Sequence, residues 1–231
     1  MEVFHVCVKG ENMIKQLPQR IFLYIIGVFA LSLGVVFTIN SNLGVSPIQA
    51  IPFVTSLITG FSMGSSVFAV LAVFTLLQIL ILRRDFKWIQ ITQLIATFFF
   101  GYFVDFSRFL LYGFYLPGYF GQLFKLFVGI GLTVVGVSLY TRAGLVNLPP
   151  EGLTLAIVKK TPGGVFHRVR IVQDTSLLII AAVLSFLFLN GLYGIREGTA
   201  ASALLVGKLI PFANRVFQPL LEKLGLGGYG Q

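Results

Sequence analysis

Two short polar segments, each containing proline, interrupt an apolar chain of 231 residues. The first ends in Ser46-Pro47-Ile48-Gln49, and the second contains Pro149-Pro150-Glu151. Serine, proline and glutamine at the first spacing are typical of a capping box, in which polar side chains bond the free N–H groups at the start of a helix. The side chains of these segments that could form a binding site are Asn40, Asn42, Ser46, Gln49, Asn147 and Glu151.

Two interpretations of these segments stay open. In one, the polar residues only begin two short helices. In the other, the helix N-termini point into the membrane interior, where free N–H groups and the positive end of the helix dipole would bind an anionic or strongly polar group. Amide and acidic side chains are costly at apolar depth unless they are paired, which favours a binding role.

Lys208 and Asp105 are the other candidate site residues. Lys208 lies near the middle of an apolar run, and Asp105 lies toward the end of another. An ion pair between them would neutralise two expensive charges and would be purely structural. Alternatively, Lys208 is the counter-charge of a bound carboxylate, sulfonate or phosphate. A third acid, Asp174, is expected to pair with Arg168 or Arg170 at the membrane surface.

Enzyme chemistry finds little support in the sequence. The chain has one cysteine and two histidines, His5 and His167, which are separated by most of its length. No G-x-S-x-G, H-E-x-x-H, P-loop or C-x-x-C motif occurs. We therefore expect neither an enzyme nor a bound cofactor or metal.

The elements that must position these residues are membrane helices. No charged residue or histidine occurs between Ile21 and Leu82, the mean hydropathy is +0.91, and only 11% of residues are charged. A spanning helix needs about 20 apolar residues. Two segments, Pro47–Thr59 and Pro149–Lys160, are too short to span and predict re-entrant or interfacial half-helices. The six predicted spans are Ile21–Ile39, Ser65–Leu82, Trp88–Phe109, Leu123–Thr141, Ile171–Asn190 and Gly198–Arg215.

The distribution of positive charge predicts the orientation. With the N-terminus inside the cell, only Arg108, Lys125 and Arg196 of the 17 Lys and Arg residues lie outside, and Lys208 lies within a span. Cytoplasmic loops are enriched in Lys and Arg, so both termini are expected in the cytoplasm. The net charge of +9 then reflects topology, and we expect no nucleic-acid partner.

The chain also repeats itself at a shift of 102 residues. The shift aligns Gly27 with Gly129, Gly34 with Gly136, and Gln49 with Glu151, and it also aligns Val35 with Val137, Leu43 with Leu145 and Pro47 with Pro149. Because three spans per half is an odd number, the second copy must enter from the opposite face, which makes an inverted repeat typical of transporters. The predicted divisions are tails at 1–19 and 218–231 and three-helix repeats at 20–114 and 115–217.

The run from Arg20 through Gly27 and Gly34 to Asn42-Leu43-Gly44-Val45-Ser46-Pro47, followed by Gly60 and Gly64, resembles the YczE/YitT-like family of small bacterial integral membrane proteins. The resemblance extends to about Arg215 and implies a bacterial inner membrane, with little chemistry. It also implies an acidic residue soon after Pro47, where this chain has Gln49. More distantly, a six-helix chain of this size resembles the substrate-binding subunits of energy-coupling-factor vitamin importers.

The sequence thus predicts an all-α membrane protein that moves a small polar or anionic solute, with both half-helices at the binding site. Two alternatives are a capture subunit of an ATP-driven importer and an accessory protein that transports nothing. The expected partners are the lipid bilayer, the solute, and either a second copy of the chain or an ATPase.

Overall fold

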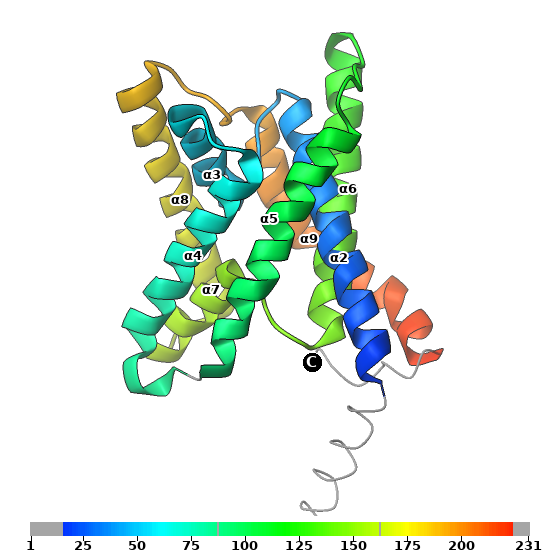
Figure 1. Cartoon of the computed structure of the whole chain (residues 1–231), viewed down its shortest axis with the longest axis vertical. Helices are drawn as coiled ribbons and strands as arrows, with labels where there is room; N and C mark the ends of the chain where they lie inside the picture. The colour runs from blue at the N-terminus through cyan, green and yellow to red at the C-terminus, as the bar shows by residue number, and fades with distance from the viewer. Residues whose placement is uncertain (1–15, 87, 162, 224–231) are drawn as a thin grey trace, which may run out of the picture.

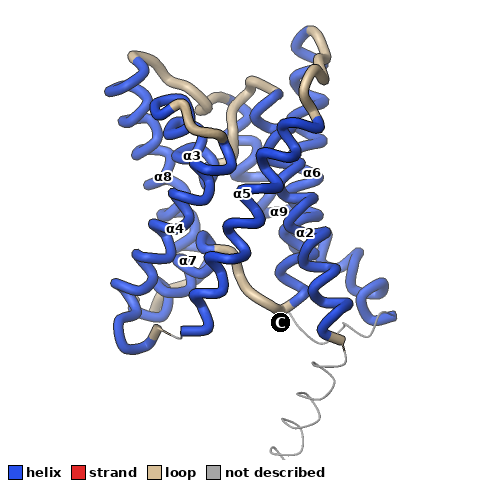
Figure 2. Tube along the Cα trace, viewed as in Figure 1, coloured by secondary structure: helices blue, strands red, loops and turns tan. Residues whose placement is uncertain are grey.

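The described residues of the computed structural model, 16–86, 88–161 and 163–223, form helices and connecting loops without a strand (Figures 1 and 2). The predicted all-α class is therefore confirmed for this part of the chain. Most of the predicted tails lie outside it. The helices are α2 (Leu17–Asn40), α3 (Pro47–Thr59), α4 (Met63–Leu82), η1 (Arg83–Asp85), η2 (Trp88–Ile91), α5 (Thr92–Leu110), α6 (Gly118–Ala143), α7 (Pro149–Lys160), α8 (Phe166–Leu189) and α9 (Glu197–Lys223).

Five helices of the described residues are long and apolar enough to cross a membrane: α2, α4 with η1, α6, α8 and α9. The remaining predicted span, Trp88–Phe109, is not among them. It begins as the 3₁₀ helix η2, and the following α5 contains Gln93, Asp105 and Arg108, which lower its hydropathy. Helix α5 nevertheless packs beside α2 and α4 within the bundle.

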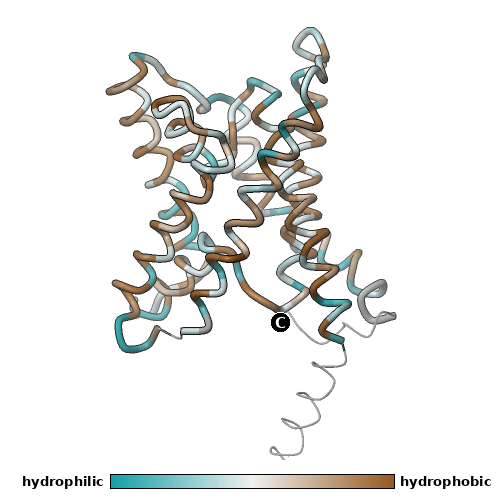
Figure 3. Tube along the Cα trace, viewed as in Figure 1, coloured by the Kyte–Doolittle hydropathy of each residue, from teal (hydrophilic) through white to brown (hydrophobic). Residues whose placement is uncertain are grey.

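The outer surface of the bundle is apolar, as a lipid-facing surface requires. Along the long helices hydrophobic residues dominate, while hydrophilic residues gather at the two ends (Figure 3). Large apolar side chains such as Phe22, Leu80 and Leu187 are exposed there. Exposed apolar area of this extent is disfavoured in water and favoured in hydrocarbon.

Helices α2 and α6 form the central pair of the bundle. Gly27 of α2 lies against Gly136 of α6, and Gly34 lies against Gly129. A Cβ added at Gly27 would lie 2.6 Å from the Tyr140 nitrogen, and one added at Gly34 would lie 2.8 Å from the Gly129 oxygen. Small residues allow two backbones in a membrane to approach this closely. The glycines that the 102-residue shift aligns thus meet across one interface.

The helix boundaries also follow that shift. The ranges of α2, α3, α4 and α5, moved by 102 residues, fall on α6, α7, α8 and α9 within a few residues at their starts. The packing partners exchange in the same way: α3 packs on α8 and α7 on α4, while α2 packs on α5 and α6 on α9. One pair breaks the pattern, because α4 packs closely on α5 but α8 has no comparable contact with α9.

The short helices α3 and α7 lie at opposite ends of the bundle (Figure 1). At each, the first helical residue is buried, and so are Leu43 and Val45 before α3 and Leu148 before α7, which are at most 3% exposed. The other ends, at Gly60 and at Lys159, are exposed. Each short helix therefore begins inside the bundle and ends at its surface, which favours the re-entrant arrangement over helices lying flat on the membrane.

Candidate functional site

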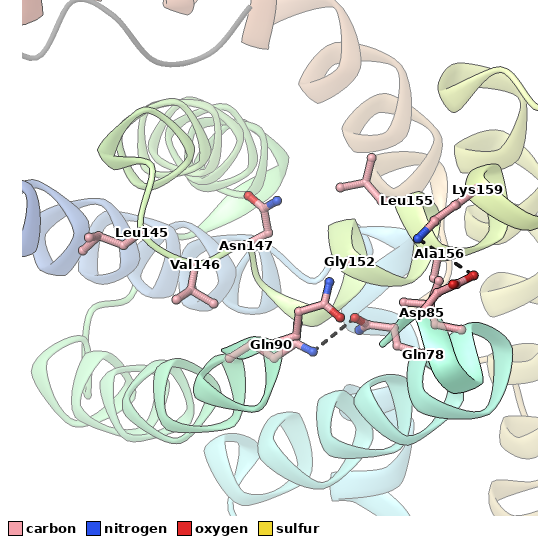
Figure 4. A pocket seen from close by; sticks show the side chains of 12 residues that line it. Gln78, Asp85, Gln90, Leu145, Val146, Asn147, Gly152, Leu155, Ala156 and Lys159 are labelled. Atoms are coloured by element: carbon pink, nitrogen blue, oxygen red, sulfur yellow. Dashed lines mark hydrogen bonds and ion pairs between the residues drawn. The ribbon is translucent and has the colours of Figure 1, made fainter. Parts of the chain in front are cut away.

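The first pocket, here called the amide pocket, lies beside α7 and has a volume of about 320 Å³. Figure 4 shows Gln78 and Gln90 beside Gly152, with Asn147 on the opposite side and Asp85 facing Lys159. Its lining residues are Gln78, Leu82, Asp85, Gln90, Gln93, Leu145, Val146, Asn147, Gly152, Leu155, Ala156 and Lys159.

A chain of amides connects α5 and α4 to the start of α7. Gln93 Nε2 donates to Gln78 Oε1 at 3.1 Å, and Gln78 Nε2 donates to the Pro149 carbonyl at 3.0 Å. Both glutamines are at most 3% exposed. Gly152 leaves the space that Gln78 needs, since a Cβ there would lie 2.6 Å from Gln78 Oε1. Buried amides with these bonds hold the N-terminal end of α7 in a fixed place.

Helix α8 holds the other side of the same helix start. Gln173 Nε2 donates to the Pro150 carbonyl at 3.2 Å, and Thr154 Oγ1 donates to Gln173 Oε1 at 2.8 Å. The two proline carbonyls at the tip of α7 are thus each bonded by a glutamine from a neighbouring long helix. In the sequence, these glutamines stand out as polar residues within apolar runs, although none of them is among the predicted site residues.

Charged residues surround α7 as well. Arg170 lies 3.5 Å from Glu151 Oε1 and 3.2 Å from Asp174 Oδ1. The predicted pairing of Asp174 with Arg168 or Arg170 is therefore confirmed for Arg170. At the exposed end, Asp85 lies 2.6 Å from Lys160 Nζ and ties η1 to α7, although exposed pairs of this kind add little stability.

The second pocket, here called the cation pocket, lies at the end of the bundle that carries α3 and has a volume of about 420 Å³. It brings together Asn40 and Asn42, which the sequence predicted, with Arg108 and Lys125, which it did not. Lys125 is 5% exposed. The lining residues are Ile39, Asn40, Asn42, Phe53, Arg108, Leu111, Tyr112, Gly113, Phe114, Tyr115 and Lys125.

The expected capping box at Ser46 does not form. Ser46 precedes α3 but makes no side-chain capping bond, and the Gln49 backbone nitrogen donates to the Ser46 carbonyl at 2.9 Å. The buried Gln49 Oε1 has no hydrogen-bond partner within the described residues. Pro47 provides the helix start without a cap, because its ring fixes a helical φ and removes one free donor.

The expected pair of Asp105 with Lys208 does not form either. Asp105 accepts bonds from Ser62 Oγ at 2.6 Å and from the Gly64 nitrogen at 2.8 Å, so it caps the start of α4. Lys208 is exposed on α9 and lines neither pocket. The reason is the packing: α5 contacts α2 and α4, whereas α9 contacts α6, so the two helices lie on different sides of the central pair.

The remaining predicted residues are divided between the two ends of the bundle. Asn147 lines the amide pocket and Glu151 pairs with Arg170 close by, while Gln49 lies in α3 at the other end. No group of three His, Cys, Asp or Glu residues that could hold a metal ion occurs in the described part of the chain.

Comparison with known proteins agrees with the resemblance drawn from the first proline segment. The chain is 28% identical over 201 residues to the uncharacterised protein YyaS of Bacillus subtilis, covering 87% of this chain and 92% of that protein. It is 29% identical over 201 residues to the uncharacterised membrane protein YczE of the same organism, covering 86% and 87%. No solved structure matches.

Neither relative is described as part of a vitamin importer, so that more distant resemblance stays a prediction. The model of DUF6198, a family of unknown function, matches residues 18–215. That range contains both pockets, both short helices and the central glycine pair. This chain is a helical membrane protein and belongs to the DUF6198 family, among YczE-like proteins.

Proposed function

We propose that this protein moves a small polar or anionic solute across the bacterial cytoplasmic membrane by alternating access. The observation that carries the proposal is the pair of short helices, α3 and α7, which begin inside the bundle from opposite ends. Broken or half-length helices that end near the middle of a membrane are the usual place for a transporter to bind its substrate. Each short helix here has a pocket beside it.

The proposed mechanism needs two halves related by an inverted repeat of three spans each, with α5 as the third span of the first half. The exchange of packing partners under the 102-residue shift supports this arrangement. The glycine contacts of α2 with α6 would then lie near the pseudo-two-fold axis. Small rotations about such an axis open one end while they close the other, which is the alternation that transport requires.

The proposed orientation places the amide pocket at the cytoplasmic side, together with both chain termini. It rests on the basic residues of η1, α7 and the start of α8, which gather at one end of the bundle. Arg108, Lys125 and Arg196 lie at the other end, which would face outward.

A substrate-capture subunit is the second candidate. The observation that favours it is the difference between the pockets: Arg108 and Lys125 line the outer one, while amides and an ion-paired lysine line the other. A protein that only captures a solute needs its charged site at one face. This alternative predicts that the chain co-purifies with an ATPase.

Single cysteines test alternating access directly. In a Cys7→Ser background, Asn42→Cys reports on the cation pocket and Asn147→Cys on the amide pocket. A thermal-shift screen of carboxylates, phosphates, sulfonates and amino acids first identifies a solute that binds. We expect this solute to change the rates of labelling by a thiol reagent in opposite directions at the two positions, in proteoliposomes that also take the solute up.

The exposed position Arg84, carried as Arg84→Cys, is the matched control and should label at a constant rate. Unchanged labelling at both pockets, with no solute uptake, would contradict transport. Binding without uptake, together with a co-purified ATPase, would support the capture subunit instead.

A further inference from the structure

We propose that the cation pocket binds the carboxylate of a small organic anion, with Lys125 and Arg108 as its counter-charges. This inference deepens the proposed function and rests on it for the biological role, since it names the class of solute. The binding itself can be tested without any transport assay.

Lys125 is the residue that points to a ligand. It is 5% exposed, lines the cation pocket, and makes no hydrogen bond or ion pair with any described residue. It lies seven positions after Gly118, about 10 Å along α6 from the start of the helix. A lysine that is largely covered by protein and whose ammonium has no partner among the described residues favours an anion beside it. An anion bound in the pocket would be such a partner.

Among the acids whose side chains the structure describes, none provides that partner. The lining of the pocket contains no Asp or Glu. Asp105 is one turn from Arg108 on α5, but both of its oxygens are bonded at the start of α4. Glu197, the acid in the first turn of α9, is paired with Arg196 at 3.1 Å. Within the described part of the chain, Lys125 and Arg108 therefore have no carboxylate partner.

The other polar groups of the pocket suit an anion too. Asn40 and Asn42 carry amide N–H donors, and Arg108 supplies a planar guanidinium that can bind both oxygens of a carboxylate. Arg196 donates to the Asn42 carbonyl at 3.0 Å, which fixes the loop that carries Asn42. Asn42 has a φ of 56°, a conformation that asparagine tolerates better than most residues.

Apolar side chains form much of the remaining wall, beside Tyr112 and Tyr115, and would select the kind of anion. Ile39, Phe53, Leu111 and Phe114 line the pocket, and Phe114 is held edge-to-face against Phe37 at 5.9 Å between ring centroids. A volume of about 420 Å³ falls within the range of small-molecule sites. Bound inorganic phosphate would leave these apolar side chains exposed to water, whereas the apolar part of an organic carboxylate would cover them.

The positions that the internal repeat pairs with the two cations of this pocket are not charged. The positions that the 102-residue shift pairs with Lys125 and Arg108 hold Leu23 and Ile210. In the amide pocket the lysine, Lys159, lies 3.9 Å from Asp85. The cations are thus an addition to one end of the bundle and not a consequence of its pseudo-symmetry.

The test uses the full chain in nanodiscs of phosphatidylcholine with benzoate as the probe and benzamide as its neutral counterpart. Binding is measured by calorimetry. We expect benzoate to bind and benzamide to bind at least tenfold more weakly. Lys125→Gln and Arg108→Gln should each weaken benzoate binding about tenfold or more, because each removes a charge-assisted bond. Lys125→Arg should retain it, and the control Arg84→Gln should bind as the unmodified chain does.

A second measurement separates a binding role from a structural one. Without benzoate, Lys125→Gln should melt at the same or a higher temperature than the unmodified chain, since it removes a charge that has no partner among the described residues. A large loss of stability instead, or equal binding of benzoate and benzamide, would overturn the proposal. So would benzoate binding that Lys125→Gln leaves unchanged.

A lipid phosphate is the other anion that could reach this end of the bundle. Nanodiscs with phosphatidylglycerol should leave benzoate affinity almost unchanged if the site belongs to a soluble carboxylate. Strong competition from this lipid would overturn the assignment to a soluble solute.

If benzoate binds through Lys125 but proteoliposomes take up no benzoate, the binding site stands and transport fails. Uptake of benzoate that Lys125→Gln leaves unchanged would support transport and would overturn the assignment of Lys125 to the binding site.

Discussion

Buried polar side chains have two different tasks in this protein. Gln78, Gln93 and Gln173 are bonded to other amides and to the carbonyls at the start of α7, and they stabilise the helix that they contact. Lys125 has no such bond. The glutamines therefore belong to the architecture, while Lys125 is the residue to which we assign the proposed carboxylate.

Replacing Gln78 tests the structural group. Gln78→Ala removes the bonds to Gln93 and to the Pro149 carbonyl and leaves a buried gap, so we expect a loss of about 1–3 kcal/mol and a lower melting temperature in detergent. Gln90→Ala is the matched control, because Gln90 Oε1 has no hydrogen-bond partner in the described structure. Equal effects of the two substitutions would contradict the assignment.

At the scale of elements, two features set where the pockets lie. The half-helices create an end inside the bundle, and the glycines of α2 and α6 bring the two halves into contact. Prolines begin both short helices, and the tip of α7 is fixed by side chains from α4 and α8. The contact between α2 and α6 also positions the cation pocket, which residues of both helices line.

Alanine substitutions in α6 test the central contact. A Cβ at Gly136 would lie 2.7 Å from the Gly27 oxygen, whereas one at Gly131 would meet nothing within 4 Å. Gly136→Ala should therefore lower the melting temperature. Gly131→Ala should be neutral or stabilising by up to about 1 kcal/mol, because alanine favours a helix more than glycine does. Stability that falls by the same amount in both variants would refute this close packing.

At the scale of the whole molecule, the positive charge is sorted between two ends of an apolar bundle. The end with α7 carries the basic residues of η1 and α7, and the end with α3 carries the cation pocket. If the positive-inside rule holds here, a solute from outside would meet Arg108 and Lys125 first.

Labelling of intact cells tests this orientation. In a Cys7→Ser background, a membrane-impermeant maleimide should react with Tyr119→Cys and not with Arg84→Cys until the cells are opened. Both side chains are exposed in the structure, so burial would not explain a difference. Reaction at Arg84→Cys in intact cells would reverse the orientation and place the cation pocket in the cytoplasm.

Local patterns in the sequence were sufficient for the membrane class, the short helices and the glycine alignment. Each depends on residues close in the chain: an uncharged run long enough for a span, a proline that begins a helix, and a length too short to cross. The predicted ranges Pro47–Thr59 and Pro149–Lys160 agree with the observed helices for this reason. The sequence also predicts Asn40 and Asn42 as site residues, since they precede a proline loop; both line the cation pocket, and their binding role stays a prediction.

Only the tertiary structure decided which polar residues meet. The repeat predicts Asp105 beside Lys208 because it makes their helices equivalent, but α5 packs on α2 and α4, whereas α9 packs on α6. Asp105 therefore caps α4, and Lys208 is exposed. The sequence alone marks Lys125 only as a charge of the outer side, because the residues of α2, α3 and α5 that share its pocket are distant in the chain. Packing between distant segments determines which polar side chains are buried and which are paired, and the spacing of residues along the chain does not reveal it.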